Sequence, residues 1–355
     1  MKVSKNVSHV LFACFVGLFS ILAISQPGYA LQVGFLVGDV YVTRDGATRT
    51  ASMGLQLQKD DIVKTAKGGM AELNFKDGSV LTVKESSKIR IVTVHGGEQD
   101  SFSVMAGIVK ARFSKLKKGS HRKIYTPTTV CGIRGTEFEI AVSDSVDSKV
   151  HMKEGVVDLQ NQYGKSKVKG TDQAKIPVAG KPEMIEDDST IDKWKENKDK
   201  DFSENPSAGA ERLTRHLDVM KERADNNSES ISEMKNTLPG DSADEDEKDL
   251  EKISQVISTE AVVEDDMFMN QAASGAIDHI LENFDREKKD IYDNFLKIKK
   301  ESNKVLEQQE KNYQAIQAVK EAYKKAYGEI MDSHQEYMDS IKNNIDKDSV
   351  KPRLE

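Results

Sequence analysis

Cysteine, proline and tryptophan are scarce in this chain of 355 residues, which contains two cysteines, seven prolines and one tryptophan. Cys14 lies in an apolar segment near the N-terminus, so Cys131 is the only cysteine left if that segment is removed. A chain with a single cysteine forms no internal disulfide. Because Cys131 lies in an apolar run with no histidine nearby in the sequence, we expect a buried, inert thiol.

Sequence motifs of catalytic chemistry are also absent. None of the seven histidines lies in an HExxH motif, and the chain contains no CxxC, GxSxG or glycine-rich phosphate loop. The acidic cluster 241–247 lacks the alternating oxygen ligands and the internal glycine of a calcium loop. We therefore expect no enzymatic activity, no cofactor and no metal site. The net charge of −7 suits solubility and indicates no particular partner.

Long apolar runs are missing, with one exception near the N-terminus. Two lysines precede an almost purely apolar run from 10 to 24, and small residues follow at Gly28 and Ala30. This pattern predicts a cleaved secretory signal peptide over residues 1–30, with Leu31 as the new N-terminus, and an uncleaved anchor is the alternative. We expect an exported, periplasmic protein with no transmembrane span after cleavage.

The distribution of glycine and proline divides the chain into two parts. Residues 31–180 contain 17 of the 23 glycines, residues 181–355 contain four, and no proline lies between Pro239 and Pro352. Frequent glycine favours short strands and turns, whereas a long region without proline favours helices. We expect an all-β N-terminal domain, either a sandwich or a solenoid-like stack of hairpins, followed by an α-helical, coiled-coil-like region.

Alternating apolar and polar residues mark the strands of the first part. Residues 71–75 alternate, Asp77-Gly78 follows, and a second run lies at 80–83. An Asp-Gly pair between two such runs is a strong hairpin signal, because glycine adopts the positive φ of the turn. The further alternating runs are 89–94, 102–113, 138–142 and 156–159.

Short motifs follow one another in a fixed order through this part. A Gly-x-Val strand comes first, then an alternating strand into Asp-Gly-Ser, a second glycine-led strand, a Thr-Pro and Arg-Gly-Thr-x-Phe pair, and a closing Glu-Gly-x-Val. Lys59-Asp60 precedes an apolar-x-Thr step after the first of these motifs, at a place where the family named below usually has Gly-Asp. The residues of these motifs are Gly38, Asp77, Gly78, Gly107, Thr126, Pro127, Arg134, Gly135, Thr136, Phe138 and Gly155. Their order over residues 31–180 resembles the FecR domain, the periplasmic module of iron-dicitrate-type signalling regulators.

Two departures limit what this resemblance implies for function. Family members that regulate sigma factors carry a cytoplasmic helical segment before a membrane span, whereas only nine residues precede the apolar run here. A small α/β domain after the FecR domain, which contacts the outer-membrane transducer in those regulators, is not evident either. The resemblance therefore implies a stand-alone exported FecR-like module, and we expect no direct control of a sigma factor.

The segment 134–137 has two interpretations. Arg134 and Glu137 can form an exposed pair that binds a partner. Alternatively the segment is a structural turn, in which Gly135 permits the backbone conformation, Thr136 bonds the turn, and Arg134 braces a carboxylate or carbonyl groups. We favour the structural interpretation.

A basic segment is the clearest surface feature of the predicted β-domain. Alternation in 110–113 puts the cations on one face of a strand. Such a segment can attract an envelope protein, an anionic envelope polymer, a lipid headgroup or the chain's own acidic tail, and a solvated hairpin is the alternative. Nucleic acid is not expected, because aromatic residues that stack on bases are missing. The candidate binding residues are Lys110, Arg112, Lys115, Lys117, Lys118, Arg122 and Lys123.

The second part of the chain is divided by composition. Residues 181–248 are expected to form an acidic linker with one short helix, whose apolar stripe includes Leu213 and Leu217. A long amphipathic, coiled-coil-like region follows over 249–347, and residues 348–355 are expected to be a disordered tail.

An apolar stripe with steps of three and four residues extends from 277 to 345. An unbroken helix of that length would reach about 100 Å. Its stripe must pair with itself, with another chain or with the helix at 210–238, and a homo-oligomer through 277–345 is one outcome. Ser302, Gln309 and Asn312 interrupt the stripe. The tyrosines on the stripe are expected to be core residues.

These observations predict an exported, non-enzymatic FecR-like binding or sensing module of the cell envelope, displayed or oligomerised by a C-terminal helical stalk. The alternative is a structural envelope spacer or scaffold, in which the β-domain caps a coiled coil. A third hypothesis, a sugar hydrolase, requires a carboxylate-lined groove in the β-domain.

Overall fold

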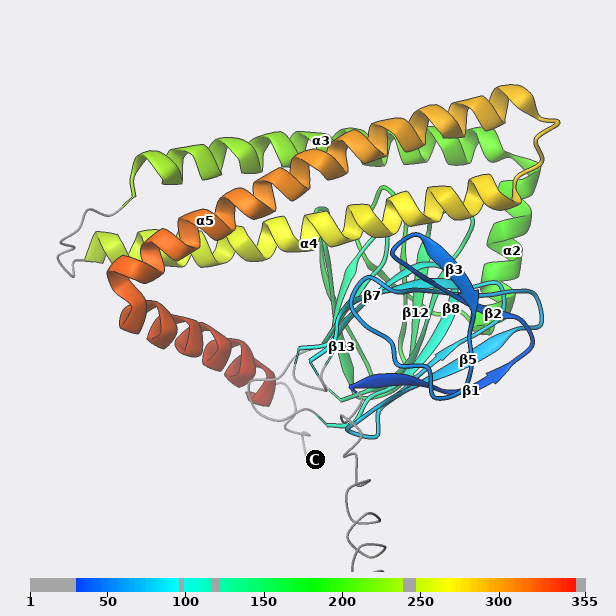
Figure 1. Cartoon of the computed structure of the whole chain (residues 1–355), viewed down its shortest axis with the longest axis horizontal. Helices are drawn as coiled ribbons and strands as arrows, with labels where there is room; N and C mark the ends of the chain where they lie inside the picture. Colours follow the sequence, from blue (N-terminus) through cyan, green and yellow to red (C-terminus); the bar gives the residue numbers. More distant parts are fainter. Residues whose placement is uncertain (1–29, 96–98, 116–121, 134, 239–246, 349–355) are drawn as a thin grey trace, which may run out of the picture.

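The structure of the chain is a computed structural model in which strands come first and helices follow (Figure 1). It describes residues 30–95, 99–115, 122–133, 135–238 and 247–348, with the side chains of 247–250 and 329–348 left out. The predicted signal peptide lies outside these ranges except for Ala30. Among the described residues, no helix has the length and apolar character that a bilayer span requires.

The predicted all-β domain is confirmed, and it consists of two sheets that share one long strand, β8 (Ser101–Arg112). The strand order of one sheet is β1-β5-β6-β8-β11-β12-β15-β16, and that of the other is β3-β2-β4-β7-β8-β9-β10-β13-β14. The other strands are β1 Leu31–Val37, β2 Val40–Arg44, β3 Ala47–Thr50, β4 Ile62–Thr65, β5 Met70–Phe75, β6 Val80–Val83, β7 Lys88–Thr93, β9 Arg122–Tyr125, β10 Val130–Ile133, β11 Glu137–Val142, β12 Ser148–Glu154, β13 Val156–Asn161, β14 Gly164–Lys169, β15 Gln173–Ile176 and β16 Glu183–Ile185.

Strand β8 changes sheets at Gly107. The first half of β8 pairs with β7 and, in parallel, with β9, whereas the second half pairs with β6 and β11. Gly107 has a φ of 90°, and a Cβ atom there would lie 2.1 Å from the Ser87 hydroxyl. Glycine is therefore required at this bend. The sequence places Gly107 at the entry of a strand, but the structure places it in the middle of one.

The core of the β-domain lies between the two sheets, where the inward residues of the alternating runs meet. Leu73 and Leu81 from the predicted hairpin pack with Phe102 and Phe138, and all four are completely buried. The hairpin turn at Gly78 has a φ of 82°, as the Asp-Gly signal predicts. Cys131 is buried in the same core, and burial raises the pKa of its thiol. Both observations agree with the predicted inert thiol.

Arg122 belongs to this interior, in contrast to its predicted place on the basic surface. Its guanidinium has an exposed fraction of 0% and donates to Asp77 Oδ2 at 2.7 Å and to Asp100 Oδ2 at 3.3 Å. It also lies over the rings of Phe75 and Phe113, at 5.1 and 4.7 Å from their centroids. The charge is tolerated because both carboxylates and both ring faces surround it.

Four helices follow the β-domain: α2 (Ile191–Glu204), α3 (Pro206–Asn236), α4 (Glu247–Asn283) and α5 (Lys289–Asp348). The side chain of Asn205 accepts from Ala208 N at the start of α3, and Pro206 occupies the first turn. The predicted acidic linker with a short helix is wrong in extent, because α2 and the 31-residue α3 occupy most of it.

The predicted apolar stripe does not follow one continuous helix. Residues 284–288 separate α4 from α5, and α5 returns alongside α4 and α3 (Figure 1). Phe295 near the start of α5 packs with Ile277 near the end of α4, while Tyr323 packs with Val256 near the start of α4. The stripe is therefore covered within the chain as far as Tyr327, in part by the predicted 210–238 partner.

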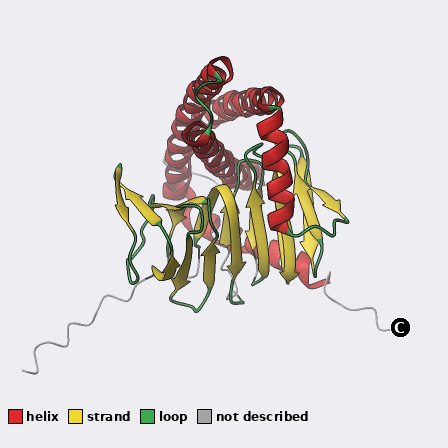
Figure 2. Cartoon of the chain, turned by 90° about the vertical axis from the view of Figure 1, so that its right-hand side faces the viewer, coloured by secondary structure: helices red, strands yellow, loops and turns green. Residues whose placement is uncertain are grey.

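The helical arm, which comprises α3, α4 and α5, lies on one side of the strands (Figure 2). An apolar cluster joins the arm to the sheet that contains β7. Val92 and Tyr125 from the sheet pack with Met220 of α3, Met269 of α4 and Val305 of α5. The arm thus packs against the β-domain, and of the pairings that the sequence allows, the structure shows the one within the chain.

We predict that replacing Arg122 with methionine destabilises the β-domain by about 3–5 kcal/mol, because the change leaves two carboxylates without their buried cation. The free energy of unfolding in urea would measure this loss. Arg112→Met is the matched control, since Arg112 is exposed at the end of β8 in the same domain, and its expected change is within about 0.5 kcal/mol. Equal stability of the two variants would contradict a buried role for Arg122.

Candidate functional site

The structure distributes the predicted basic residues among different environments. Arg112 and Lys115 are exposed at the end of β8, with no ion-pair partner among the described residues. Lys110 lies 2.9 Å from Glu137 Oε1. Lys117 and Lys118 lie outside the described part of the chain. The predicted single basic surface is thus reduced to a basic corner, which we define as Arg112 and Lys115.

Lys123 is used inside the chain. Its Nζ lies 2.7 Å from Asp265 Oδ1 and 3.3 Å from Glu264 Oε2, both on α4. Burial lowers the pKa of Lys123, but the two carboxylates outweigh burial and raise it above its usual value. Lys123 therefore attaches β9 to the helical arm, and the acidic partner that the sequence suggests for this segment is partly the chain's own helix.

The residues of the FecR-like motifs take structural positions. The Thr126 hydroxyl accepts from the backbone of Thr128 and Thr129 and closes the turn around Pro127. Phe138 and Thr136 are buried. Gly135 has a φ of 67°, and a Cβ there would lie 2.7 Å from the Lys115 backbone. Arg134 lies outside the described residues, so its predicted bracing role stays a prediction.

A small pocket of about 130 Å³ lies between the β-domain and the helical arm. Strands β7 and β8 supply Lys88, Arg90 and Met105, α4 supplies Gln271 and Asp278, and α5 supplies Lys299. The alternation of β7 explains this lining, because Ile89 and Ile91 point into the core and their neighbours point towards the arm. Neither the pocket nor its cations were expected from the sequence.

Two of the three cations at this pocket have carboxylate partners. Lys88 lies 3.0 Å from Glu282, and Lys299 lies 2.8 Å from Asp278. Arg90 has no carboxylate partner in the described part of the chain, and its contact is with the Gln271 amide oxygen at 3.4 Å. Three cations against two carboxylates leave the pocket with a net positive charge.

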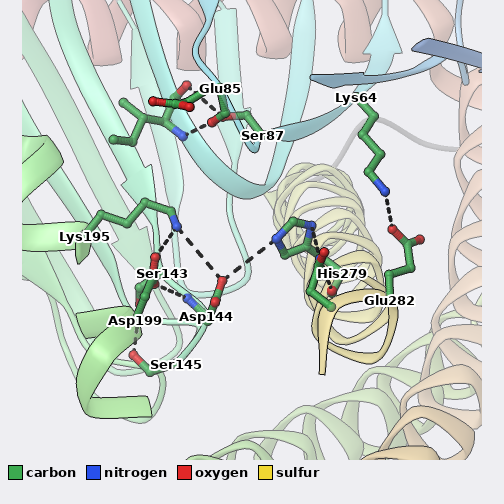
Figure 3. A network of polar contacts seen from close by, with 12 residues as sticks. Lys64, Glu85, Ser87, Ser143, Asp144, Ser145, Lys195, Asp199, His279 and Glu282 are labelled. Atoms are coloured by element: carbon green, nitrogen blue, oxygen red, sulfur yellow. Dashed lines mark hydrogen bonds and ion pairs between the residues drawn. The ribbon is translucent and has the colours of Figure 1, made fainter. Parts of the chain in front are cut away.

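A network of polar contacts beside this pocket links the turn after β11 to α2 and α4 (Figure 3). The backbone N of Asp144 donates to Asp199 Oδ1 at 2.8 Å, and Lys195 pairs with Asp199. Asp144 Oδ1 also lies 3.9 Å from His279 Nε2 on α4. Burial, followed by the charge of Asp144, raises the pKa of Asp199.

Glu282 continues the same contact surface one turn after His279 (Figure 3). Its carboxylate accepts from Lys64 Nζ at 2.6 Å and from Lys88 Nζ at 3.0 Å. Both lysines belong to the β-domain. The end of α4 is therefore attached to the β-domain by the two ion pairs of Glu282, one turn after His279.

Two histidines at the contact between helices and β-domain are held in the neutral form. Burial lowers the pKa of His279 to about 4, and the neighbouring cations Lys195, Lys88 and Lys64 act in the same direction. Burial also lowers the pKa of His216 on α3, which is completely buried beside Gln162, to about 4. Protonation of either ring would place a charge in a site that does not stabilise it.

The sequence of α4 contains a signal for this contact. Helix α4 contains the small residues Ala272-Ala273-Ser274-Gly275-Ala276, which are all buried. A Cβ on Gly275 would lie 2.3 Å from the sulfur of Met105 on β8. A run of small residues in an otherwise charged helix indicates close approach to another layer, and the pocket lies beside this approach.

We predict that stability falls as the pH decreases from about 6.5 towards 4, because the unfolded chain then binds protons that His279 and His216 in the folded chain do not. The slope is at most about 1.4 kcal/mol per pH unit for each histidine. Urea unfolding of wild type and of a His216→Gln, His279→Gln double variant at several pH values measures it. The variant should show a shallower slope, and parallel slopes would contradict the assignment. The raised pKa of Asp199 acts in the opposite sense in both proteins.

Comparisons with known proteins agree with the motif order. Residues 61–158 match the family model described as FecR protein. Two crystal structures of a protein assigned as an anti-sigma factor from Parabacteroides distasonis ATCC 8503 are similar, with 13% and 14% identity and TM-scores of 0.32 and 0.33. The alignments cover 36% and 38% of this chain, but only 60% and 63% of those chains. No curated protein matches significantly. The expected resemblance to the FecR domain is thus confirmed for residues 61–158, within the β-rich part of the chain.

Proposed function

We propose that this protein is an exported, non-enzymatic FecR-like module that binds and senses a component of the cell envelope. The FecR match supports a regulatory or sensing role in general. The periplasmic location comes from the predicted signal peptide. The bound component is an envelope protein or an anionic envelope polymer, and no catalytic step, cofactor or nucleic acid is part of the proposal.

One observation carries the choice of binding surface. The basic corner, Arg112 and Lys115, is the part of the predicted basic set that is exposed and without an ion-pair partner among the described residues. Strand β8 holds Arg112 in place, and the backbone approach at Gly135 holds Lys115. Cations at fixed, solvated positions accelerate and orient the association with an anionic partner.

The helical arm stiffens the module in this proposal. It packs on the sheet that contains β7, and the basic corner lies where β8 pairs with β6 and β11 in the other sheet. The corner therefore stays accessible while the arm is packed. The alternative function, a structural spacer, uses the same fold but does not use the corner.

The charge-reversal variant Arg112→Glu, Lys115→Glu is expected to lose its envelope partner, with binding weakened by about tenfold or more because attraction becomes repulsion. Co-purification from envelope extracts, followed by titration of the recovered partner, measures this. The matched control is Lys165→Glu, Lys169→Glu, which changes the charge equally on exposed positions of β14. If both variants retain the partner equally, the spacer function is favoured.

Light scattering of the purified protein tests oligomerisation through 277–345. We expect the mass of one chain, because the apolar stripe is buried within the chain as far as Tyr327. A dimer or larger assembly would contradict this expectation and would favour oligomerisation through 277–345.

A further inference from the structure

We propose that the pocket between the β-domain and the helical arm binds a small oxyanion, either a carboxylate or a phosphate group, through Arg90. This site differs from the basic corner and does not depend on it. The first argument is the lining, which combines Arg90, Lys88 and Lys299 with the polar side chain of Gln271. The pocket belongs to both halves of the molecule.

The second argument is the unused hydrogen-bonding capacity of Arg90. Its Nε is buried without an acceptor, and its NH1 makes only a long contact of 3.4 Å with Gln271. Among the charged residues at the pocket, Lys88 and Lys299 have carboxylate partners and Arg90 has none. A guanidinium presents two parallel N–H donors, which match the two oxygens of a carboxylate or phosphate group.

The third argument is a neighbouring hydroxyl. Ser103 lies opposite Arg90 in the pairing of β7 with β8 and is completely buried. Its hydroxyl has no hydrogen-bond partner among the residues that the structure describes. Ser103 does not itself line the pocket, so it adds a second unpaired buried donor next to Arg90 on the neighbouring strand.

The size of the pocket limits the ligand. Its volume of about 130 Å³ is below the range of about 300–1,000 Å³ that holds drug-sized ligands. Inorganic phosphate, or the carboxylate end of a small acid, fits the volume of this pocket better than a polymer does. Since β7, α4 and α5 all line the pocket, a bound anion would connect the β-domain to the arm and tighten their contact.

Calorimetric titration of the purified protein with potassium phosphate and, separately, with sodium succinate tests this site against sodium chloride of equal ionic strength. We expect at least one oxyanion to bind and to raise Tm. Binding of phosphate alone would assign a phosphate ligand, binding of succinate alone a carboxylate ligand, and binding of both a general oxyanion site. No heat and no Tm shift up to about 10 mM of either anion would overturn the proposal.

Arg90→Gln should weaken binding by about tenfold or more, because the paired donors are lost. Arg90→Lys retains the positive charge but not the two parallel donors, so its affinity for the oxyanion should lie between those of wild type and Arg90→Gln. Arg49→Gln is the matched control, since Arg49 is exposed on β3, and it should bind as wild type does. Equal binding by folded Arg90→Gln and wild type would overturn the proposal. The Arg112→Glu, Lys115→Glu variant should retain oxyanion binding, which separates this site from the proposed envelope contact.

Discussion

The apolar stripe of α5 has to be covered, and the arrangement of the whole C-terminal half follows from this constraint. Helix α5 runs from Lys289 to a kink at Tyr327 and on to Asp348, and leaving its apolar side in water would cost far more than a turn costs. The break at 284–288 returns the stripe onto α3 and α4. Helix α4 then lies between α5 and the β-domain, so it needs apolar or small side chains on more than one of its faces. The buried run 272–277 meets this requirement.

The seam between these helices is not purely apolar. Ser302, Gln309 and Asn312 interrupt the stripe as the sequence indicates, and all three are buried. Asn312 donates to the Ala224 carbonyl oxygen at 2.6 Å, which fixes α5 against α3, but both polar side-chain atoms of Gln309 lack partners. Buried polar groups of this kind lower stability and restrict the registers in which helices can pair. The helices are therefore aligned more specifically than an apolar seam would require.

Local patterns predict local structure well in this chain, and long-range pairing limits the rest. The hairpin at Asp77-Gly78 was predictable because both strands and the turn residues are contiguous. The burial of Arg122 was not predictable, because its partner Asp77 lies 45 residues away and the residues around Arg122 in the sequence indicate a basic surface. The break before α5 contains no proline or glycine that would mark it. The pocket could not be predicted either, because the elements that line it, β7, α4 and α5, are far apart in the sequence.

The energies of the contact decide what a ligand in the pocket can do. The apolar cluster of Val92, Tyr125, Met220, Met269 and Val305 holds the arm to the β-domain. Burial of five such side chains contributes on the order of 10 kcal/mol. At about 10 mM, a small anion with a Kd of about 1 mM stabilises the state that binds it by only about 1.4 kcal/mol, which is too little to separate the arm. Its effect must therefore be to tighten a contact that is already closed. The anion proposed for this pocket would thus tighten the contact at the end of α4, where Glu282 and His279 meet the β-domain.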